Sequence, residues 1–532
     1  MAVLLAAASL AYAAAPATDP LTLKFHRQAI RRFVFSNNIP LTRLAPAEIV
    51  ALELMHPVMP GDGQRCVYSL GDGVLHITAP VAGESALYVG GVNPFATCQI
   101  DVRSIETTAP LEIAIELATM DRSTRVQLVC RYPADRDSVR LRLVRDHKVI
   151  RQQVFRADRA LEPPYILRAQ LSGVSLSAFV TKDGRTSYLG HTTPGELFGD
   201  VIDFRSRKII ATSSFNVFTS LPAGAKVTLG GAESFLSAGL GQADIRPITR
   251  RDGAPIIEDG RLFFTFSARG LNISDSFQGV MSLNPSTFDM RFEGAIVYDR
   301  GDGLLRNDYS SHVFYDDDAR EWRSFASCFS VDKAGRGPTG LALGRSRHDP
   351  RRGFSVLQEK LFTGIQAEHE DPCIIHDEQA GKWRLLTTRL EGMRAMLFEA
   401  DNWDGPYRHI AGPVDRNSTG TLIQKIGQRR YVFCGSSDRA VYIYSYPDLK
   451  MLGTLNMDLP PWLPEGNGRV WPNVFPLPAG YPARYMALMM DRPNFPGVRG
   501  GNWSYGALHL YWADTDSIDG EAFEYPLPPG PP

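Results

Sequence analysis

The sequence predicts an all-β protein in two parts, an antiparallel β-sandwich (jelly roll) followed by a five-bladed β-propeller. In the first part, short runs that alternate apolar and polar residues are separated by Gly, Asp and Pro, as in residues 139–144 and 176–180. This pattern is typical of an antiparallel sandwich. After about residue 239, five units of similar type recur at intervals of about fifty residues, which is the spacing of a small sheet repeated radially as a propeller blade.

The N-terminal region predicts export. Residues 1–15 form a short apolar run that ends in small residues with an Ala-x-Ala pattern, as in a secretory signal peptide. An uncleaved tail or a lipid anchor is the alternative. We therefore expect a periplasmic or secreted protein. No later stretch reaches the ~18 apolar residues of a membrane span, so no membrane partner is expected.

Residues 16–41 are expected to form a linker. Within it, residues 21–35 have helical spacing with a basic face, which predicts a helix packed on the body rather than on a membrane surface.

Charge and cysteine content narrow the functional classes. The formal net charge of −1 on 532 residues argues against a nucleic-acid partner, which normally requires a basic face. Six cysteines are spread without C-x-x-C spacing, so no metal cluster and no cofactor are predicted. A structural calcium and the oligomeric state stay open. In an oxidising compartment Cys66 could pair with Cys98 or Cys130.

The sandwich is predicted over residues 42–238 and the propeller over residues 239–532. The boundary falls at residues 236–243, where glycines precede Ala243 and Asp244. The order of features in the first part resembles the lectin-like jelly rolls that are attached to carbohydrate enzymes. That resemblance assigns no binding residue, and a scaffolding role is an equal alternative.

Each of the five units begins with polar residues before an apolar strand. Inner strands of a propeller surround one axis, so residues at equivalent positions are expected to meet in one funnel. The residues delivered there are Asp244 with Arg246, Asn307 with Asp308, His369 with Glu370 and Asp371, Asn417 with Thr419, and Arg469 with Trp471.

Carboxylates from three successive units suit cleavage of a glycosidic bond. One carboxylate must be ionised to act as base or nucleophile, one must hold a proton for the leaving oxygen, and a third can raise the pKa of the acid. An aromatic wall with amide and guanidinium donors is a usual partner of sugar rings. Taken singly, Asp244, Asp252 and Asp308 could be turn residues, His312 and His369 structural histidines, and Trp471 core packing.

The second part resembles the five-bladed propeller glycoside hydrolases of families 43, 62, 32, 68 and 130. Asp244 lies in an Ala-Asp opening, Asn307-Asp308 stands at the second position, and Glu370-Asp371-Pro372 is similar to a Glu-x-Pro motif. The resemblance implies an aspartate base, an aspartate pKa modulator and a glutamate acid. Their counterparts here are Asp244, Asp308 and Glu370, and the expected substrate-binding residues are Arg246, Asn307, His369, Asp371, Asn417, Arg469 and Trp471.

Two departures from the family pattern leave alternatives open. The proline after Asp244 is displaced to position 247, so Asp252 could be the first-blade carboxylate. Glu370-Asp371-Pro372 also resembles the Arg-Asp-Pro element of families 32 and 68, in which the aspartate binds sugar hydroxyls.

These features predict an exported glycoside hydrolase with a carbohydrate substrate and an inverting mechanism. A retaining fructan-type enzyme is the first alternative, and a phosphorylase is a weaker one. A non-catalytic carbohydrate-binding propeller is the alternative from a different class.

Overall fold

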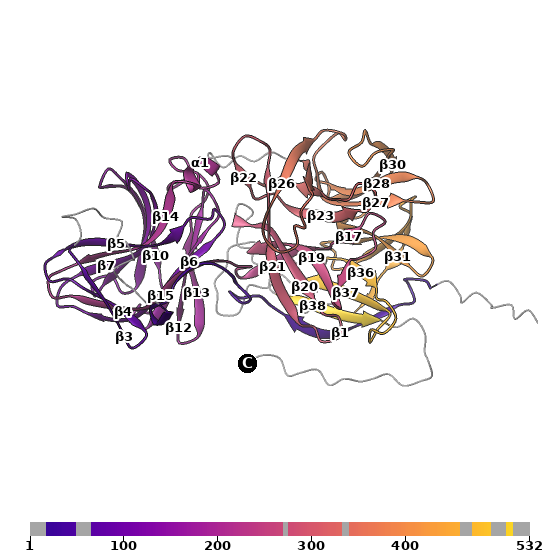
Figure 1. Ribbon diagram of the computed structural model, residues 1–532. Coiled ribbons are helices and arrows are strands. Elements are labelled where there is room, and N and C mark those ends of the chain that lie inside the picture. Colours follow the sequence, from indigo (N-terminus) through magenta and orange to yellow (C-terminus); the bar gives the residue numbers. More distant parts are fainter. Residues whose placement is uncertain are drawn as a thin grey trace, which may run out of the picture.

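The computed structural model describes residues 18–48, 65–269, 275–331, 340–457, 471–490 and 507–513. The expected signal peptide (residues 1–15) and Arg469 lie outside these ranges. The described residues form an all-β structure with two bodies, a sandwich and a propeller, which lie beside each other in Figure 1. The short helix α1 (Arg207–Ile210) and the 3-10 turn η1 (Pro46–Glu48) accompany the strands. No helix among the described residues is long and apolar enough to cross a membrane.

The sandwich consists of two antiparallel sheets whose facing sides enclose one apolar core. In strands such as β4 (Val74–Thr78) and β9 (Ser138–Arg145), alternating residues enter this core, as the sequence pattern predicts. The larger sheet contains β13 (Arg185–His191), β12 (Leu176–Lys182), β11 (Tyr165–Leu171), β6 (Thr97–Glu106), β15 (Lys226–Leu236), β4 (Val74–Thr78) and β3 (Val67–Gly71), with β2 (Ile39–Leu44) also paired to β15. The smaller sheet contains β10 (Lys148–Arg156), β9 (Ser138–Arg145), β8 (Thr124–Tyr132), β7 (Leu111–Thr119), β14 (Ser213–Leu221) and β5 (Gly83–Gly91).

The propeller has five blades, each a meander of antiparallel strands that starts at an inner strand. Blade 1 contains β16 (Gly241–Pro247), β19 (Arg261–Arg269), β20 (Phe277–Leu283) and β21 (Met290–Asp299); blade 2 contains β23 (Tyr309–Asp316), β24 (Glu321–Ser327), β25 (Leu341–Ser346) and β26 (Gly353–Phe362). Blade 3 contains β27 (His369–Asp377), β28 (Lys382–Arg389), β29 (Arg394–Ala400) and β30 (Arg408–Ala411); blade 4 contains β31 (Thr419–Ile426), β32 (Arg429–Gly435), β33 (Tyr442–Ser445) and β34 (Met451–Thr454). Blade 5 contains β36 (Asn473–Pro476), β37 (Tyr485–Met490), β38 (Leu508–Ala513) and β1 (Lys24–Arg31), with β35 (Asn456–Met457) at its outer edge.

The five inner strands form a closed ring. Each contacts the inner strand of the next blade, and β36 of blade 5 contacts β16 of blade 1. Short strands add local pairings: β17 (Thr249–Arg250) pairs with β23, β18 (Ile257–Glu258) with β19, and β22 (Leu305–Arg306) with β21. Blades 1 and 2 are also joined at their outer edges, where β21 and β26 pair in parallel. An apolar cluster between these two blades is therefore covered on its outer side.

The helix expected over residues 21–35 is wrong, because residues 24–31 form strand β1. This strand pairs antiparallel with β38 and lies beside it in Figure 1. A β-bulge between Arg27 and Ala29 adds one residue to the strand, so the buried residues Phe25 and Ala29 are four apart. A four-residue interval between apolar residues is the helical signature, and the bulge reproduces it within a strand. The sandwich is thus inserted between the outer strand of blade 5 and the first strand of blade 1.

The sandwich packs on the propeller through buried polar contacts. Arg269, at the end of β19, is fully buried and donates to the main-chain oxygen of Leu171 (2.5 Å) and to Ser172 Oγ (2.8 Å). Ser175 Oγ of the sandwich donates to Asp275 Oδ1 of the propeller at 2.6 Å. Arg269 and Asp275 are both buried, so these hydrogen bonds lie inside the contact between the two bodies.

All six cysteines are buried free thiols, so the pairing of Cys66 with Cys98 or Cys130 expected for an oxidising compartment is wrong. Cys66, Cys98 and Cys130 lie in the apolar core of the sandwich. Burial raises the pKa of the Cys98 and Cys130 thiols, as expected for small side chains packed among apolar residues.

Candidate active site in the ring of inner strands

Four inner strands carry the same β-bulge near their N-terminal ends. In each strand one residue has a left-handed backbone with φ between 49° and 59°: Asp244 in β16, Ser310 in β23, Asp371 in β27 and Gly420 in β31. Asp and Gly adopt this conformation more readily than most residues. The bulge allows these four strands to be aligned residue by residue. In this alignment Glu370 lies one position before the left-handed residue of its strand, Asp371, and Asp308 lies two positions before Ser310.

Asp371 links the bulges of three blades. Its Oδ1 accepts from Ser310 Oγ of blade 2 at 2.6 Å, and its Oδ2 accepts from Thr419 Oγ1 (2.7 Å) and from the backbone N–H of Gly420 (3.1 Å) in blade 4. Ser327 Oγ accepts from the backbone N–H of Asp371 at 3.1 Å. The side chain is 4% exposed. These hydrogen bonds come from blades 2 and 4, so the Asp371 side chain is held in one position inside the ring.

Arg246 connects blade 1 with blades 3 and 4. Its guanidinium donates to the main-chain oxygens of Asp371 (3.3 Å) and Thr421, and the residue is 2% exposed.

His312, at the equivalent position of blade 2, is also buried. Its Nδ1 accepts from the backbone N–H of Ile374 at 3.0 Å, which leaves Nε2 to donate to Thr249 Oγ1 at 3.0 Å. Burial, aided by the charge of Arg246, lowers the pKa of His312 well below its usual range. The imidazole is therefore neutral and structural.

Asp244 and Asp252 lie in different parts of blade 1. Asp244 is at the bulge, is nearly buried and accepts from Ser267 Oγ at 2.6 Å. Asp252 follows the inner strand and accepts from the N–H of Ala254 at 2.9 Å in its own turn. Of these two carboxylates only Asp244 is at the level of Glu370 and Asp371 within the ring. Glu370 is half-buried and its backbone is opposite that of Thr388.

Asp308 belongs to a buried charge cluster between blades 1 and 2. It is 0% exposed, and its oxygens accept from Arg300 Nη2 and from the backbone N–H of Ser330, both at 2.7 Å. Arg300 Nε donates to Glu359 Oε2 at 2.6 Å. One guanidinium thus lies between two carboxylates. Burial, followed by the negative charge of Asp308, raises the pKa of Glu359 to about 8, so Glu359 holds its proton to a higher pH than an exposed glutamate does.

This raised pKa predicts a pH dependence of stability. Between the ordinary pKa of a glutamate and about 8, the folded state binds a proton at Glu359 that the unfolded state has released. Stability then falls as pH rises through this window, by at most about 1.4 kcal/mol per pH unit. In Glu359→Gln the side chain cannot ionise, so we expect the variant to gain stability relative to the wild type as pH rises from about 5 to about 8. Denaturant unfolding at several pH values measures this difference, and parallel profiles would contradict it.

Apart from Arg469, which lies outside the described residues, the remaining expected substrate-binding residues have described partners. His369 is buried, donates from Nε2 to the oxygen of Gln366 (3.1 Å) and bonds Thr387 Oγ1 through Nδ1 (2.8 Å); burial lowers its pKa. Asn307 Nδ2 donates to the oxygen of Ser276 at 2.7 Å. Asn417 Oδ1 accepts from the N–H of Ser437 at 2.9 Å.

Trp471 is 4% exposed and donates from Nε1 to the oxygen of Ile245 at 2.7 Å. Its ring occupies the space that a Cβ on Gly420 would need. Trp471 therefore packs between blades 4 and 1 and helps to close the ring.

Sequence reasoning missed Arg300, Ser310 and Glu359. Glu359 alternates with Leu357 on the buried side of β26 while Gln358 and Lys360 are exposed, so the two-residue period of the strand was the available signal. Ser310 could be found only from the bulge. Within the described ranges, no group of three or more His, Cys, Asp or Glu side chains is arranged to hold a metal ion.

No family model matches this sequence, and no curated protein matches it. Solved structures with similar folds include Zg3597, a family 117 glycoside hydrolase of the marine bacterium Zobellia galactanivorans, at 10% identity and a TM-score of 0.36, covering 53% of this chain and 86% of that one. A thermostable family 43 glycoside hydrolase is similar at 10% identity and a TM-score of 0.35, covering 53% and 95%. Carbohydrate-binding module CBM66 from Bacillus subtilis is similar at 11% identity and a TM-score of 0.24, covering 34% and 97%. These matches are distant.

Proposed function

We propose that this chain is a glycoside hydrolase that cleaves a polysaccharide or oligosaccharide at the ring of inner strands. In this proposal Glu370 is the general acid and Asp244 is the base that activates water. The observation that carries it is that these two carboxylates occupy adjacent positions of one repeated bulge, on the inner strands of blades 1 and 3. Arg246, two residues after Asp244, bonds the main-chain oxygen of Asp371 next to Glu370, so the two segments lie within reach of one side chain.

The proposed stereochemical course is inversion. An inverting enzyme holds its two carboxyl groups roughly 6.5–9.5 Å apart to admit a water, whereas a retaining enzyme holds them about 5–5.5 Å apart. We assign Asp308 an electrostatic role as modulator, because its fully buried carboxylate is paired with Arg300. We also propose that the chain is exported, on the strength of residues 1–15.

A polysaccharide screen tests the proposed activity. The full chain is incubated with neutral and acidic plant, algal and microbial polysaccharides, and the release of reducing ends is measured. Hydrolysis of at least one class is expected, with a product whose initial anomeric configuration is inverted. Retention of configuration would favour the fructan-type alternative. Binding without any release of reducing ends would favour a carbohydrate-binding propeller.

A further inference from the structure

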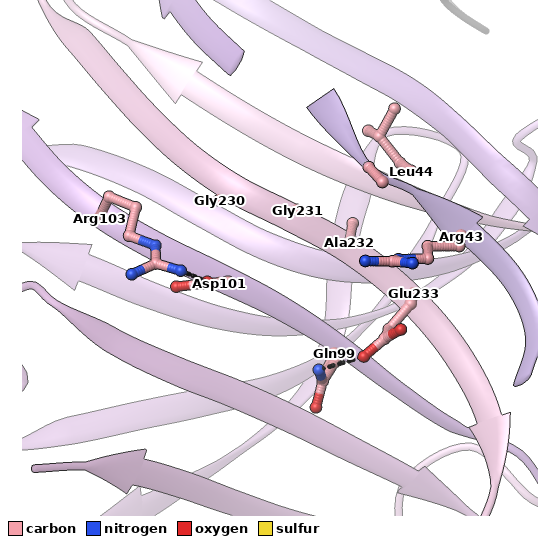
Figure 2. A pocket seen from close by; sticks show the side chains of 10 residues that line it. Arg43, Leu44, Gln99, Asp101, Arg103, Gly230, Gly231, Ala232 and Glu233 are labelled. Carbon is pink, nitrogen blue, oxygen red and sulfur yellow. Dashed lines mark hydrogen bonds and ion pairs between the residues drawn. The ribbon is translucent and has the colours of Figure 1, made fainter. Parts of the chain in front are cut away.

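The β-sandwich contains a pocket of about 210 Å³ that is separate from the ring of inner strands (Figure 2). Its walls come from β2, β6 and β15 of the larger sheet. Gln99, Asp101 and Arg103 alternate along β6 with Ile100 and Val102, which are fully buried in the sandwich core. The pocket therefore lies on the face of this sheet that is turned away from the core.

Two consecutive glycines form the floor of this pocket. A Cβ on Gly230 would lie 2.4 Å from both Arg103 Nε and Asp101 Oδ2, and a Cβ on Gly231 would lie 3.0 Å from the oxygen of Leu44. Along β15, strand β4 pairs with the residues before this dipeptide and strand β2 pairs with the residues after it. The glycines thus provide space beneath the polar side chains that larger residues would fill.

The polar groups around the floor are held in place by one another. Arg168 Nε donates to Gln99 Oε1 at 2.8 Å, which turns Gln99 Nε2 toward Glu233 Oε1 at 2.6 Å. Arg103 Nη2 lies 2.6 Å from Asp101 Oδ2. Figure 2 shows both pairs beside the strand that carries Gly230 and Gly231, and Arg43 pairs with Glu48 at 3.2 Å. The groups are fixed before any ligand arrives, which lowers the entropic cost of binding.

We infer that this pocket binds a neutral sugar residue at the end of a glycan chain. Arg103 is paired with Asp101, Arg43 is paired with Glu48 at 3.2 Å, and Arg168 lies in the field of Glu233. Three positive groups thus balance three negative ones, so the pocket offers no net attraction to a phosphate or a uronate. Carboxylate, amide and guanidinium groups together accept from and donate to the hydroxyl groups of a sugar, which themselves do both. Burial raises the pKa of Asp101, in agreement with a carboxylate that is partly withdrawn from water.

The size and lining of the pocket favour binding of the end of a glycan chain over binding of a flat polymer surface. An engineered cavity of about 150 Å³ holds a benzene ring, so a pocket of about 210 Å³ has room for one sugar ring. Among the described residues that line the pocket, none has an aromatic side chain on which successive sugar rings could stack. Recognition therefore depends on hydroxyl groups of one inserted ring.

Affinity electrophoresis of the full chain tests this inference, with gels that contain neutral fructan, xylan, arabinan, galactan or β-glucan, or the polyuronate alginate. We expect at least one neutral polysaccharide to retard the protein and its free monosaccharide to compete. Gly230→Ala places a methyl group against the flexible ends of Asp101 and Arg103, and Glu233→Gln removes a charged acceptor. Each is expected to weaken binding about tenfold or more.

Matched control variants distinguish a loss of binding at the pocket from a general effect of a substitution in the sandwich. Gly91→Ala makes the same substitution in β5 of the sandwich, where a Cβ would meet nothing within 4 Å, and Glu106→Gln removes a carboxylate from β6 outside the pocket. Both should bind as the wild type does. The inference is overturned if no neutral polysaccharide retards the protein, if only alginate does, or if Gly230→Ala and Glu233→Gln are retarded like the controls. If a polysaccharide still retards the pocket variants, the binding is assigned to the propeller. The proposed hydrolase function is unaffected by that outcome.

Discussion

Glu370→Gln is expected to lose roughly 10²–10⁴-fold of the polysaccharide activity while the fold is retained. The amide keeps the size and hydrogen-bonding shape of the carboxyl group but cannot give a proton to the leaving oxygen. The loss should be much smaller with an activated aryl glycoside, whose leaving group needs no protonation. Initial rates on the polysaccharide that the screen identifies, and on the matching aryl glycoside, measure the two losses.

Glu378→Gln is the matched control for this change. Glu378 is exposed and follows the far end of the same inner strand β27, so its substitution should leave both rates unchanged. If Glu370→Gln hydrolyses the polysaccharide at the wild-type rate, Glu370 is not the general acid. An equal loss on both substrates would indicate a positional role instead of proton donation.

Arg246→Leu is expected to lower the free energy of unfolding by about 2–4 kcal/mol, because hydrogen bonds from a charged donor to two buried carbonyls are removed together. The guanidinium of Arg246 bonds the main-chain oxygens of Asp371 and Thr421, which belong to blades 3 and 4. Leucine fills part of the space but satisfies neither oxygen. Denaturant unfolding followed by tryptophan fluorescence measures the change.

Arg250→Leu is the control for Arg246→Leu, because it also removes one arginine from blade 1. The Arg250 side chain is 54% exposed and pairs with Asp317 at 2.7 Å, so its loss should cost less than about 1 kcal/mol. Equal unfolding midpoints for the two variants would show that Arg246 does not hold the ring together.

The repeated blades could be predicted because their signals are local. Alternating residues, hairpin turns and the regular spacing of the units all lie within short segments, and the structure confirms the all-β architecture of sandwich and propeller. The strand β1 could not be predicted in this way. Its bulge imitates helical spacing, and its partner β38 lies at the other end of the chain.

The candidate site could be predicted only in part from the sequence. Asp244, Asp308 and Glu370 each stand at the start of a blade unit, but the sequence does not show which residue of each segment adopts the left-handed conformation. That choice places Asp244 at the bulge, Glu370 one residue before it and Asp308 two residues before it. The pairing of Arg300 with Glu359 depends on the edge-to-edge contact of blades 1 and 2, which has no local signal.

The position of β1 in blade 5 has a consequence for synthesis of the chain. Arg31 pairs with Leu508, so about 480 residues leave the ribosome between the two partners, and domains generally fold in the order in which they emerge. The inserted sandwich can fold while β1 still lacks its partner and the propeller is open. Through most of translation the nascent chain therefore carries an unpaired strand with Phe25 uncovered, the kind of edge that recruits foreign strands. Completion of the last blade, rather than of the first, ends this exposure.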